Sequence, residues 1–283
     1  MKSLKRFSIV TLGIIALIGA IGYAQTDLSG NEILARVDEQ SQFLSKGSMI
    51  ITLQFDNQYA DGTTSENRFA GLSKQVEGGE EYSLIYFVEP EDVSGTLFLS
   101  VKVSEGEGAR TWLYLPWSEE QGILKELVAE KQKQSFAGST FSYQDVGSRE
   151  IVDKYDAELI GEDTLTVDGE EHVAYVLALT AKPDADTDYP GGKMWVDENT
   201  WLMLKNEDYN ETGNLEKTME VLKLGEFEGN ATADQIIAKD VLEGSSTTIT
   251  FWERRRPDEE ISDDTFDAEN LDSFDPTVYG LID

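Results

Sequence analysis

The chain has 283 residues, with 55 acidic side chains against 23 basic ones, a single histidine and no cysteine. The resulting net charge of −32 opposes binding to nucleic acids or to anionic lipid headgroups through a basic patch. The absence of cysteine excludes disulfides, thiolate nucleophiles and cysteine-ligated zinc, and one histidine excludes a multi-histidine metal site, so no cofactor is expected. Because 40% of the residues are hydrophobic and 10% are aromatic, the chain can fill a core and is expected to fold.

Residues 1–24 have the pattern of a secretory signal peptide. Three basic residues lie within the first six positions, an apolar stretch covers 9–18, and small residues precede Gln25 at the spacing that signal peptidase requires. We expect cleavage near Ala24–Gln25 and a periplasmic protein whose net charge is −35. The alternative is an uncleaved N-terminal anchor, but its apolar segment of 17 residues is short for a bilayer. Residues 25–283 are expected to form one domain that ends in an acidic tail, about 257–283.

The first predicted element is a helix over 29–41. Ser29 and Glu32 have the spacing of a capping box, and apolar residues follow at helical spacing. Four segments then alternate with period two, which predicts strands. They are 49–56, 82–88, 97–103 and 111–115.

A second helix is predicted over 118–134. Ser118 and Gln121 again form a capping-box pattern, and apolar residues recur at helical spacing after them. The next segment, 135–146, is rich in aromatic residues and irregular, so we expect a turn followed by a short helix.

The second half of the sequence returns to strand patterns. Strands are predicted at 155–166, 172–181, 193–197, 201–208, 217–228 and 246–253. Residues 234–242 fit a short helix or a strand. The segment 257–275 has nine acids in 19 positions, but regularly spaced apolar residues favour docking on the body over a solvated tail.

About ten or eleven strands with few helices predict a mainly β (α+β) protein. Short turns between long strands favour one continuous antiparallel sheet that curls into a barrel or half-barrel. A sheet of this kind needs cover on its concave face. That cover makes either an ordinary packed core or a lipid-binding cavity, and composition alone does not decide between them.

Enzymatic signatures are lacking. The single histidine, His172, lies among acids at the start of a strand and is interpreted as a surface residue. No nucleophile elbow, phosphate loop or zinc motif occurs, and adjacent carboxylates arise by chance in a chain this acidic. Alternate acids over 184–188 would suit calcium, but the loop has neither the glycine nor the distal glutamate of an EF-hand, so a solvated loop is expected. We therefore predict that the protein is not an enzyme.

The aromatic segment carries a resemblance to a known family. Its sequence S-F-A-G-S-T-F-S-Y-Q-D-V resembles the signature of the larger subgroup of LolA-like outer-membrane lipoprotein-sorting proteins. The matching residues are Ser135, Phe136, Gly138, Phe141, Ser142, Tyr143 and Asp145. Weaker matches occur in the same order along nearly the whole chain after the signal peptide, at 33–38, 95–99, 110–116, 193–197 and 263–271.

The resemblance implies a fold and a function. The fold is a single curved antiparallel sheet forming an unclosed β-barrel, with helices over the concave face. The function is a periplasmic carrier that hides acyl chains of lipoproteins, or other lipids, in a hydrophobic cavity on the way to the outer membrane. Its partners would be an inner-membrane transporter complex and an outer-membrane acceptor, and the carrier itself is expected to be a monomer. Extra β-sequence after residue 150 departs from the small carriers of the family.

Strand alternation indicates which side chains would line such a cavity. The predicted lining residues are large and apolar and share one parity within each strand. They are Met49, Ile51, Leu53, Phe55, Tyr82, Leu84, Tyr86, Leu97, Leu99, Trp112 and Tyr114. A slip of one residue would invert this assignment. The 135–146 segment is predicted to be a lid or buttress anchored by Phe136, Phe141 and Tyr143.

Two other functions remain open from the sequence. A sensor or protein-interaction module of the same superfamily would need an exposed apolar strip on the convex face. A hydrolase would need a cleft of converging carboxylates. The acidic surface itself fits either a basic docking partner or a high-salt habitat.

Overall fold

The computed structural model describes residues 27–76, 80–102, 109–116, 122–147, 151–183, 185 and 187–282. The predicted signal peptide, the Ser118–Gln121 capping box and two acids of the 184–188 loop lie outside these residues. Helix α1 covers Gly30–Ser45, and α2 (Ala129–Gln132) and α3 (Tyr143–Gly147) are short. None of the helices in the described part is long and apolar enough to cross a membrane.

Thirteen antiparallel strands form one sheet within the described residues. The first six are β1 (Gly47–Gln58), β2 (Thr64–Gln75), β3 (Glu81–Glu89), β4 (Leu97–Lys102), β5 (Arg110–Leu115) and β6 (Ile123–Glu126). The next four are β7 (Tyr155–Val167), β8 (Glu170–Ala181), β9 (Gly191–Asp197) and β10 (Met203–Tyr209). The last three are β11 (Leu215–Phe227), β12 (Asn230–Asp240) and β13 (Ser245–Arg255).

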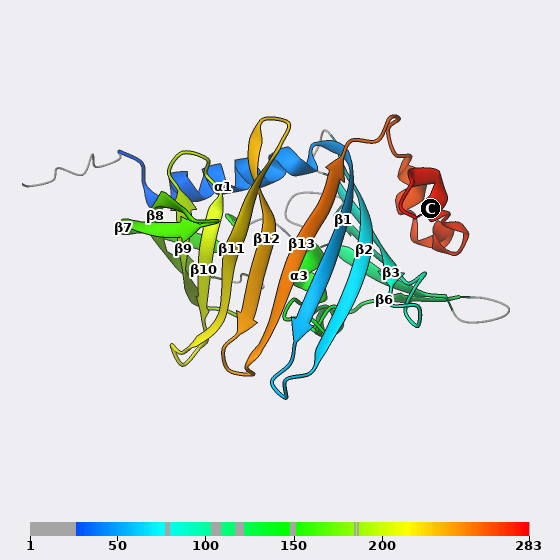
Figure 1. Cartoon of the computed structure of the whole chain (residues 1–283), viewed down its shortest axis with the longest axis horizontal. Helices are drawn as coiled ribbons and strands as arrows, with labels where there is room; N and C mark the ends of the chain where they lie inside the picture. Colours follow the sequence, from blue (N-terminus) through cyan, green and yellow to red (C-terminus); the bar gives the residue numbers. More distant parts are fainter. Residues whose placement is uncertain are drawn as a thin grey trace, which may run out of the picture.

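The sheet is curved and does not close. Its strand order is β6-β5-β4-β3-β2-β1-β13-β12-β11-β10-β9-β8-β7, so the first strand pairs with the last one in the middle of the sheet (Figure 1). The strands β6 and β7 are therefore its two edges. This architecture confirms the predicted mainly β fold with an open, curved antiparallel sheet.

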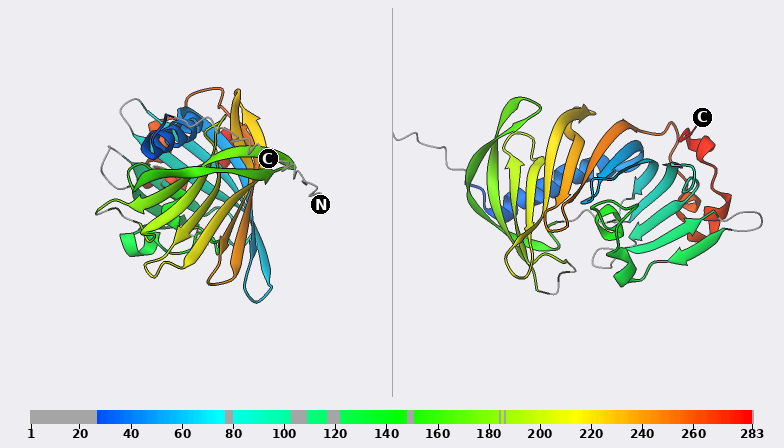
Figure 2. Two further views of the ribbon diagram at one scale, coloured as in Figure 1. Left: turned by 90° about the vertical axis from the view of Figure 1, so that its left-hand side faces the viewer. Right: turned by 60° about the horizontal axis from the view of Figure 1, so that its bottom comes forward.

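Helix α1 lies inside the curve of the sheet (Figure 2). Ser29 and Glu32 form the predicted capping box, with Ser29 N donating to Glu32 Oε2 at 2.7 Å. Ile33 and Leu34 are fully buried against apolar side chains of β8 and β9. The N-terminal end of α1 also fastens to the edge strand, because Ala157 N of β7 donates to Asn31 Oδ1 at 2.7 Å. The predicted helix is thus confirmed, and it extends four residues beyond the expected end.

The C-terminal segment, residues 257–282, docks on the opposite face of the sheet. It forms three short 3₁₀ helices, Asp263–Phe266, Ala268–Ser273 and Pro276–Tyr279. Its buried apolar side chains pack on the outer face of β1–β5, and they are Ile261, Phe266, Leu271 and Leu281. The expected docking of the tail is confirmed.

One predicted helix is wrong, one strand was not predicted, and one ambiguous segment is a strand. The sequence predicted a helix over 118–134, but the described part contains β6 at 123–126, paired with β5, and helix only at 129–132. The apolar side chains at helical spacing, Ile123 and Leu124, are exposed instead of buried. Strand β2 was not predicted, and the ambiguous segment 234–242 belongs to strand β12.

Candidate functional site

An aromatic cluster occupies the concave face over strands β1–β4. Phe55, Phe69, Phe87 and Phe98 come from four adjacent strands and are 0–5% exposed. Phe136 inserts among them and is itself 1% exposed. Its ring centroid lies 5.4 Å from those of Phe69 and Phe87 and 5.7 Å from that of Phe98. The concave face is thus apolar, and a side chain from outside the sheet fills it.

Phe136 belongs to a compact loop that we call the cover segment, residues 135–147. Phe136 N donates to Phe141 O at 2.7 Å, and Ser135 Oγ donates to Ser139 O at 2.7 Å, so the loop closes on itself. Gly138 has φ of 72°, and a Cβ atom there would lie 2.8 Å from Tyr59 Oη, so only glycine fits both demands. The motif therefore encodes a self-contained loop that presents Phe136 to the sheet.

The end of the cover segment is fixed by Ser142 and Asp145. Ser142 N donates to Asp145 Oδ2 at 2.9 Å and Asp145 N donates to Ser142 Oγ at 3.0 Å, the reciprocal pattern of a helix cap at α3. Lys217 of β11 donates to Asp145 Oδ2 at 2.9 Å. Burial alone would raise the pKa of Asp145, but the Lys217 charge and the hydrogen bonds outweigh it and lower that pKa. This ion pair ties the cover segment to the second half of the sheet.

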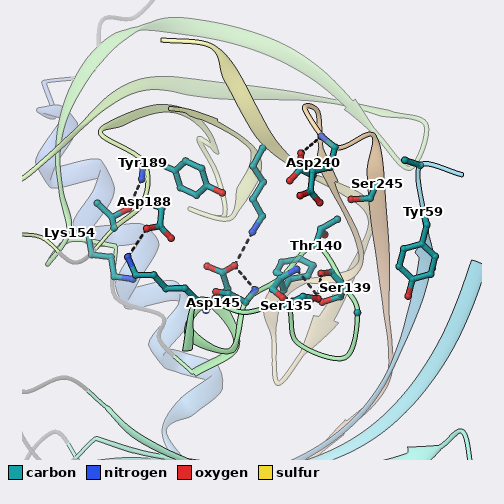
Figure 3. A pocket seen from close by; sticks show the side chains of 18 residues that line it. Tyr59, Ser135, Ser139, Thr140, Asp145, Lys154, Asp188, Tyr189, Asp240 and Ser245 are labelled. Carbon is teal, nitrogen blue, oxygen red and sulfur yellow. Dashed lines mark hydrogen bonds and ion pairs between the residues drawn. The ribbon is translucent and has the colours of Figure 1, made fainter. Parts of the chain in front are cut away.

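A polar cavity of about 440 Å³ opens beside the cover segment (Figure 3). Its walls also come from the β1–β2, β8–β9 and β12–β13 connections, which meet at one rim of the concave face. Three lysines line it, Lys133, Lys154 and Lys217. Four acids line it too, and they are Asp145, Asp188, Asp240 and Glu243. Hydroxyl groups and Phe141 complete the wall, so this space suits a polar group and not an acyl chain.

The structure divides the predicted cavity residues between two faces of the sheet. Strand pairing places Met49, Ile51, Leu53 and Phe55 on the concave face, and Leu53 and Phe55 pack with the Phe136 cluster. The other predicted residues point to the convex face, under the C-terminal segment. They are Tyr82, Leu84, Tyr86, Leu97, Leu99, Trp112 and Tyr114. The expectation that all these residues share one face is therefore wrong, and none of them lines the polar cavity.

The physical reason lies in strands that are apolar on both faces. Phe87 and Phe98 have the parity opposite to the predicted residues of β3 and β4, and they face the cover segment. Alternation within one strand does not show which of its faces is concave. The pairing that relates the faces of β1 and β3 goes through β2, which was not predicted. Phe69 of β2 pairs with both Leu53 and Phe87. The signal in the sequence was that 82–88 is apolar on its second face too, at Ile85 and Phe87.

The predicted anchors of the cover segment do lie on the sheet. Phe136, Phe141 and Tyr143 all join the concave aromatic cluster, with the Tyr143 ring 5.3 Å from those of Phe98 and Phe136. Gly138, Ser142 and Asp145 shape the loop, and Ser135 closes it. The motif acts as a plug and forms one wall of the polar cavity.

His172 is half-buried and not at the surface as expected, with its side chain 19% exposed. Its Nδ1 lies 2.9 Å from Asp197 Oδ2. Asp197 Oδ1 also accepts from the backbone nitrogens of Asn199 and Thr200 at 2.9 and 2.8 Å. Burial opposes the charge of Asp197, but the His172 and turn hydrogen bonds prevail and lower its pKa. The pair thus stabilises the β9–β10 turn.

This arrangement defines a class of protein. The open antiparallel sheet with few helices is a LolA-like fold, as the solved structures that are similar to it show. A LolA superfamily protein from Nitrosomonas europaea is 20% identical to this chain with a TM-score of 0.62, over 85% of this chain and 98% of that one. A domain from Vibrio parahaemolyticus, provisionally described as an outer membrane lipoprotein-sorting protein domain, is 24% identical with a TM-score of 0.72, over 86% and 98% of the two chains.

Family membership follows from the sequence itself. A family model described only as that of an uncharacterized protein matches residues 79–273, and the chain belongs to this family. A DUF1329 family protein from Desulfovibrio piger is 27% identical to the chain, with a TM-score of 0.75 over 86% of this chain and 97% of that one. No curated protein sequence matches the chain.

Proposed function

We propose that this protein is a periplasmic carrier that binds acyl chains of lipoproteins, or other lipids, on the concave face of its sheet. The observation that carries the proposal is the Phe136 plug. Four phenylalanines of the sheet are sealed by one loop that is closed by its own hydrogen bonds and contributes a fifth ring. A loop of this kind can leave the sheet as a unit and expose an apolar surface to a ligand.

The energetics favour exchange of the plug for a lipid chain. Each methylene removed from water contributes about 0.8 kcal/mol, so a chain of about 16 carbons gains roughly 12 kcal/mol when fully buried. Exposing the three aromatic anchors of the cover segment costs roughly 1.5–3 kcal/mol for each ring. The apolar gain of the ligand therefore exceeds the apolar loss of the plug, and this difference offsets loss of the Lys217–Asp145 ion pair and the Thr140–Thr247 hydrogen bond. Binding requires no covalent bond to be made or broken.

The fold relatives support this proposal at the level of architecture. The domain from V. parahaemolyticus that is similar to this chain is described in terms of lipoprotein sorting, and the two chains share a fold. The protein-interaction hypothesis is not favoured, because the apolar convex face of β1–β5 is covered by the chain's own C-terminal segment. The carboxylates of the polar cavity do not favour a hydrolase, since Asp145 and Asp188 are bound to Lys217 and Lys133.

A reversible lock on the cover segment tests the proposal. Thr140 N donates to Thr247 Oγ1 of β13 at 2.9 Å, which makes these positions suitable for an engineered disulfide in a chain that has no other cysteine. We expect Thr140→Cys combined with Thr247→Cys to take up a fluorescent acyl chain when reduced. When oxidised, the same protein should bind it at least tenfold more weakly, because the plug cannot leave.

Each single-cysteine variant is the matched control and should behave alike under both conditions. Mass spectrometry of the intact protein measures the extent of the cross-link. Equal uptake by the cross-linked and reduced protein would show that the plug does not gate the concave face. Delipidated wild-type protein that takes up no acyl chain, and that carries no lipid when purified, would overturn the carrier function.

A further inference from the structure

The polar cavity has two ends of opposite charge. Lys154 lies beside Asp188 and Tyr189 at one side, whereas Asp240 lies at the other side with Ser245 (Figure 3). Lys133 joins the first side through its ion pair with Asp188 at 2.6 Å. At the other side, Glu243 N donates to Asp240 Oδ1 at 2.7 Å, and both acidic residues line the cavity there.

The middle of the cavity is neutral. Lys217 and Asp145 pair between the two ends, and their charges cancel. Among the described residues, no ion pair or hydrogen bond engages the Lys154 ammonium or the Glu243 carboxylate. One cation and one anion thus remain available at opposite ends of the same cavity.

This pattern selects the chemistry of an occupant. A purely anionic group would meet Asp240 and Glu243, and a purely cationic group would meet Lys133 and Lys154, so each would gain at one end and lose at the other. A zwitterion gains at both ends. An apolar chain is excluded because hydroxyl and charged groups would lose hydrogen bonds to water without replacement.

The cavity borders the apolar concave face, with the cover segment between the two. Phe141 lines the polar cavity and packs in the aromatic cluster around Phe136. When the rings of the cover segment leave the sheet, an acyl chain on the concave face would lie next to a headgroup held by the cavity walls of the β8–β9 and β12–β13 connections. The volume of about 440 Å³ lies within the range of small-molecule sites.

We propose that this cavity binds a zwitterionic phosphoethanolamine headgroup, with the phosphate at Lys133 and Lys154 and the ammonium at Asp240 and Glu243. The inference rests on the proposed function, since the headgroup belongs to a lipid whose acyl chain lies on the concave face. It adds a headgroup preference to a carrier that would otherwise select only for apolar chains.

The test compares two short-chain lipids that differ only in the headgroup. Native mass spectrometry of the delipidated full chain measures binding of dihexanoyl phosphatidylethanolamine and dihexanoyl phosphatidylglycerol, with glycerophosphoethanolamine as the headgroup without chains. We expect the ethanolamine lipid to bind about tenfold more tightly than the glycerol lipid, the effect of one charge-assisted hydrogen bond. Glu243→Gln should remove this preference by weakening the ethanolamine lipid alone, and Lys154→Gln should weaken both lipids.

Lys223→Gln and Glu211→Gln are matched controls, because both side chains are exposed and lie outside the cavity. They should bind like the wild type, and thermal melting should show that all four variants are folded. Equal binding of the two lipids would overturn the headgroup site, and so would a preference that both cavity variants retain. In either case, uptake of the acyl chain would still support the carrier function. Binding of glycerophosphoethanolamine without any lipid or acyl-chain binding would retain the site and overturn the carrier function. If none of these ligands binds, both proposals fail.

Discussion

Asp208 on β10 is a carboxylate that folding removes largely from water. Burial raises its pKa to about 6, and the hydrogen bond from Asn206 Nδ2 to Asp208 Oδ1, 2.7 Å long, offsets only part of that effect. The folded chain therefore binds this proton more tightly than the unfolded chain does. The contribution of Asp208 to the free energy of unfolding is therefore greatest at low pH. It declines as the pH rises from about 4 to about 6 and is lost above that.

We expect Asp208→Asn to stabilise the protein at neutral pH. An asparagine keeps the shape and can still accept from Asn206, but it carries no buried charge. A shift of about two pKa units corresponds to at most roughly 3 kcal/mol, and partial solvent exposure reduces the expected gain to about 1–2 kcal/mol. Urea unfolding should give equal free energies for variant and wild type at pH 3.5 and a difference at pH 7. The exposed Asp156→Asn is the control, and a gain at pH 7 no larger than this control's would contradict the argument.

Lys74 anchors the beginning of the C-terminal segment to the sheet. Its side chain is 8% exposed, and its Nζ donates to Ile261 O at 2.9 Å and to Asp263 Oδ1 at 2.7 Å. The Asp263 hydrogen bond raises the pKa of Lys74 above its ordinary value. The charge therefore stabilises the fold at every pH below about 10.5, and this contribution disappears only as the pH rises through the higher folded value.

Lys74→Met should loosen the C-terminal segment before the rest of the protein. Loss of a hydrogen bond to a charged group, with Ile261 O left buried, costs about 2 kcal/mol. Hydrogen exchange should show faster amide exchange over 261–281 at constant global protection of β8 and β9. Lys223→Met changes an exposed lysine of β11 in the same way and should leave this exchange unchanged. Unchanged exchange in Lys74→Met would mean that apolar packing alone holds the segment.

At the scale of elements, the C-terminal segment shields the convex face of β1–β5 from water. Phe266 packs against Tyr82 with ring centroids 5.3 Å apart, and Phe274 packs against Tyr86 at 6.2 Å. Arg255 also donates to Tyr279 O at 2.6 Å, which fixes the turn back toward β13. An antiparallel sheet can face water on one side, but here both faces of β1–β5 are apolar, so the second face also needs cover.

Truncation after Pro257 should therefore expose an apolar surface that promotes self-association. The large apolar side chains of β3–β5 would lose their cover, and contiguous apolar patches of this kind drive association. Light scattering after size exclusion should detect dimers or larger species, and a hydrophobic dye should bind more strongly than to the full chain. As a control, a full-length chain with Val278→Ser changes a residue that is 71% exposed and should remain like the wild type. A monomeric truncated chain with unchanged dye binding would contradict this role.

The elements differ in how far the sequence predicts them. α1 was predictable because its cap and its buried stripe are both local signals. β6 was not, since its spacing of apolar residues is helical and only pairing with β5 makes it a strand. β2 was missed because small and polar residues such as Gly71 and Ser73 interrupt its alternation, although they face Ile51 and Met49 across the ladder. Long-range pairing, which local periodicity does not contain, decides all such cases.

In the candidate site too, local features could be predicted from the sequence and features that depend on the fold could not. The 135–146 motif is contiguous, so its loop and its aromatic anchors could be recognised from the sequence. The polar cavity joins Lys217 and Glu243 to Lys154 and Asp145, residues from four separate segments that only the folded sheet brings together. The face assignment failed for a related reason, since Leu84 and Phe87 are equally apolar and only the fold determines which one faces the plug.

At the scale of the whole molecule, one continuous sheet links the two halves of the chain through a single central pair. β1 and β13 connect the β1–β6 half, which holds the plug, to the β7–β13 half, which holds α1. The cover segment contacts both halves, because Phe136 packs on the first and Lys217 holds Asp145 from the second. The cover segment therefore bridges the two halves of the sheet across its concave face.

The net charge of −32 acts on this whole structure and not at one site. Like charges repel one another more strongly when the chain is compact, so the folded state is destabilised at low ionic strength, and salt screens that repulsion. We expect the urea midpoint to rise as sodium chloride increases from about 10 mM to about 500 mM. A charge-reduced control, with exposed acids Glu158, Glu162 and Glu211 changed to Gln, should show a smaller rise. A midpoint that falls with salt would mean that attractive ion pairs such as Lys217–Asp145 outweigh the repulsion, and that the acidic surface stabilises the fold.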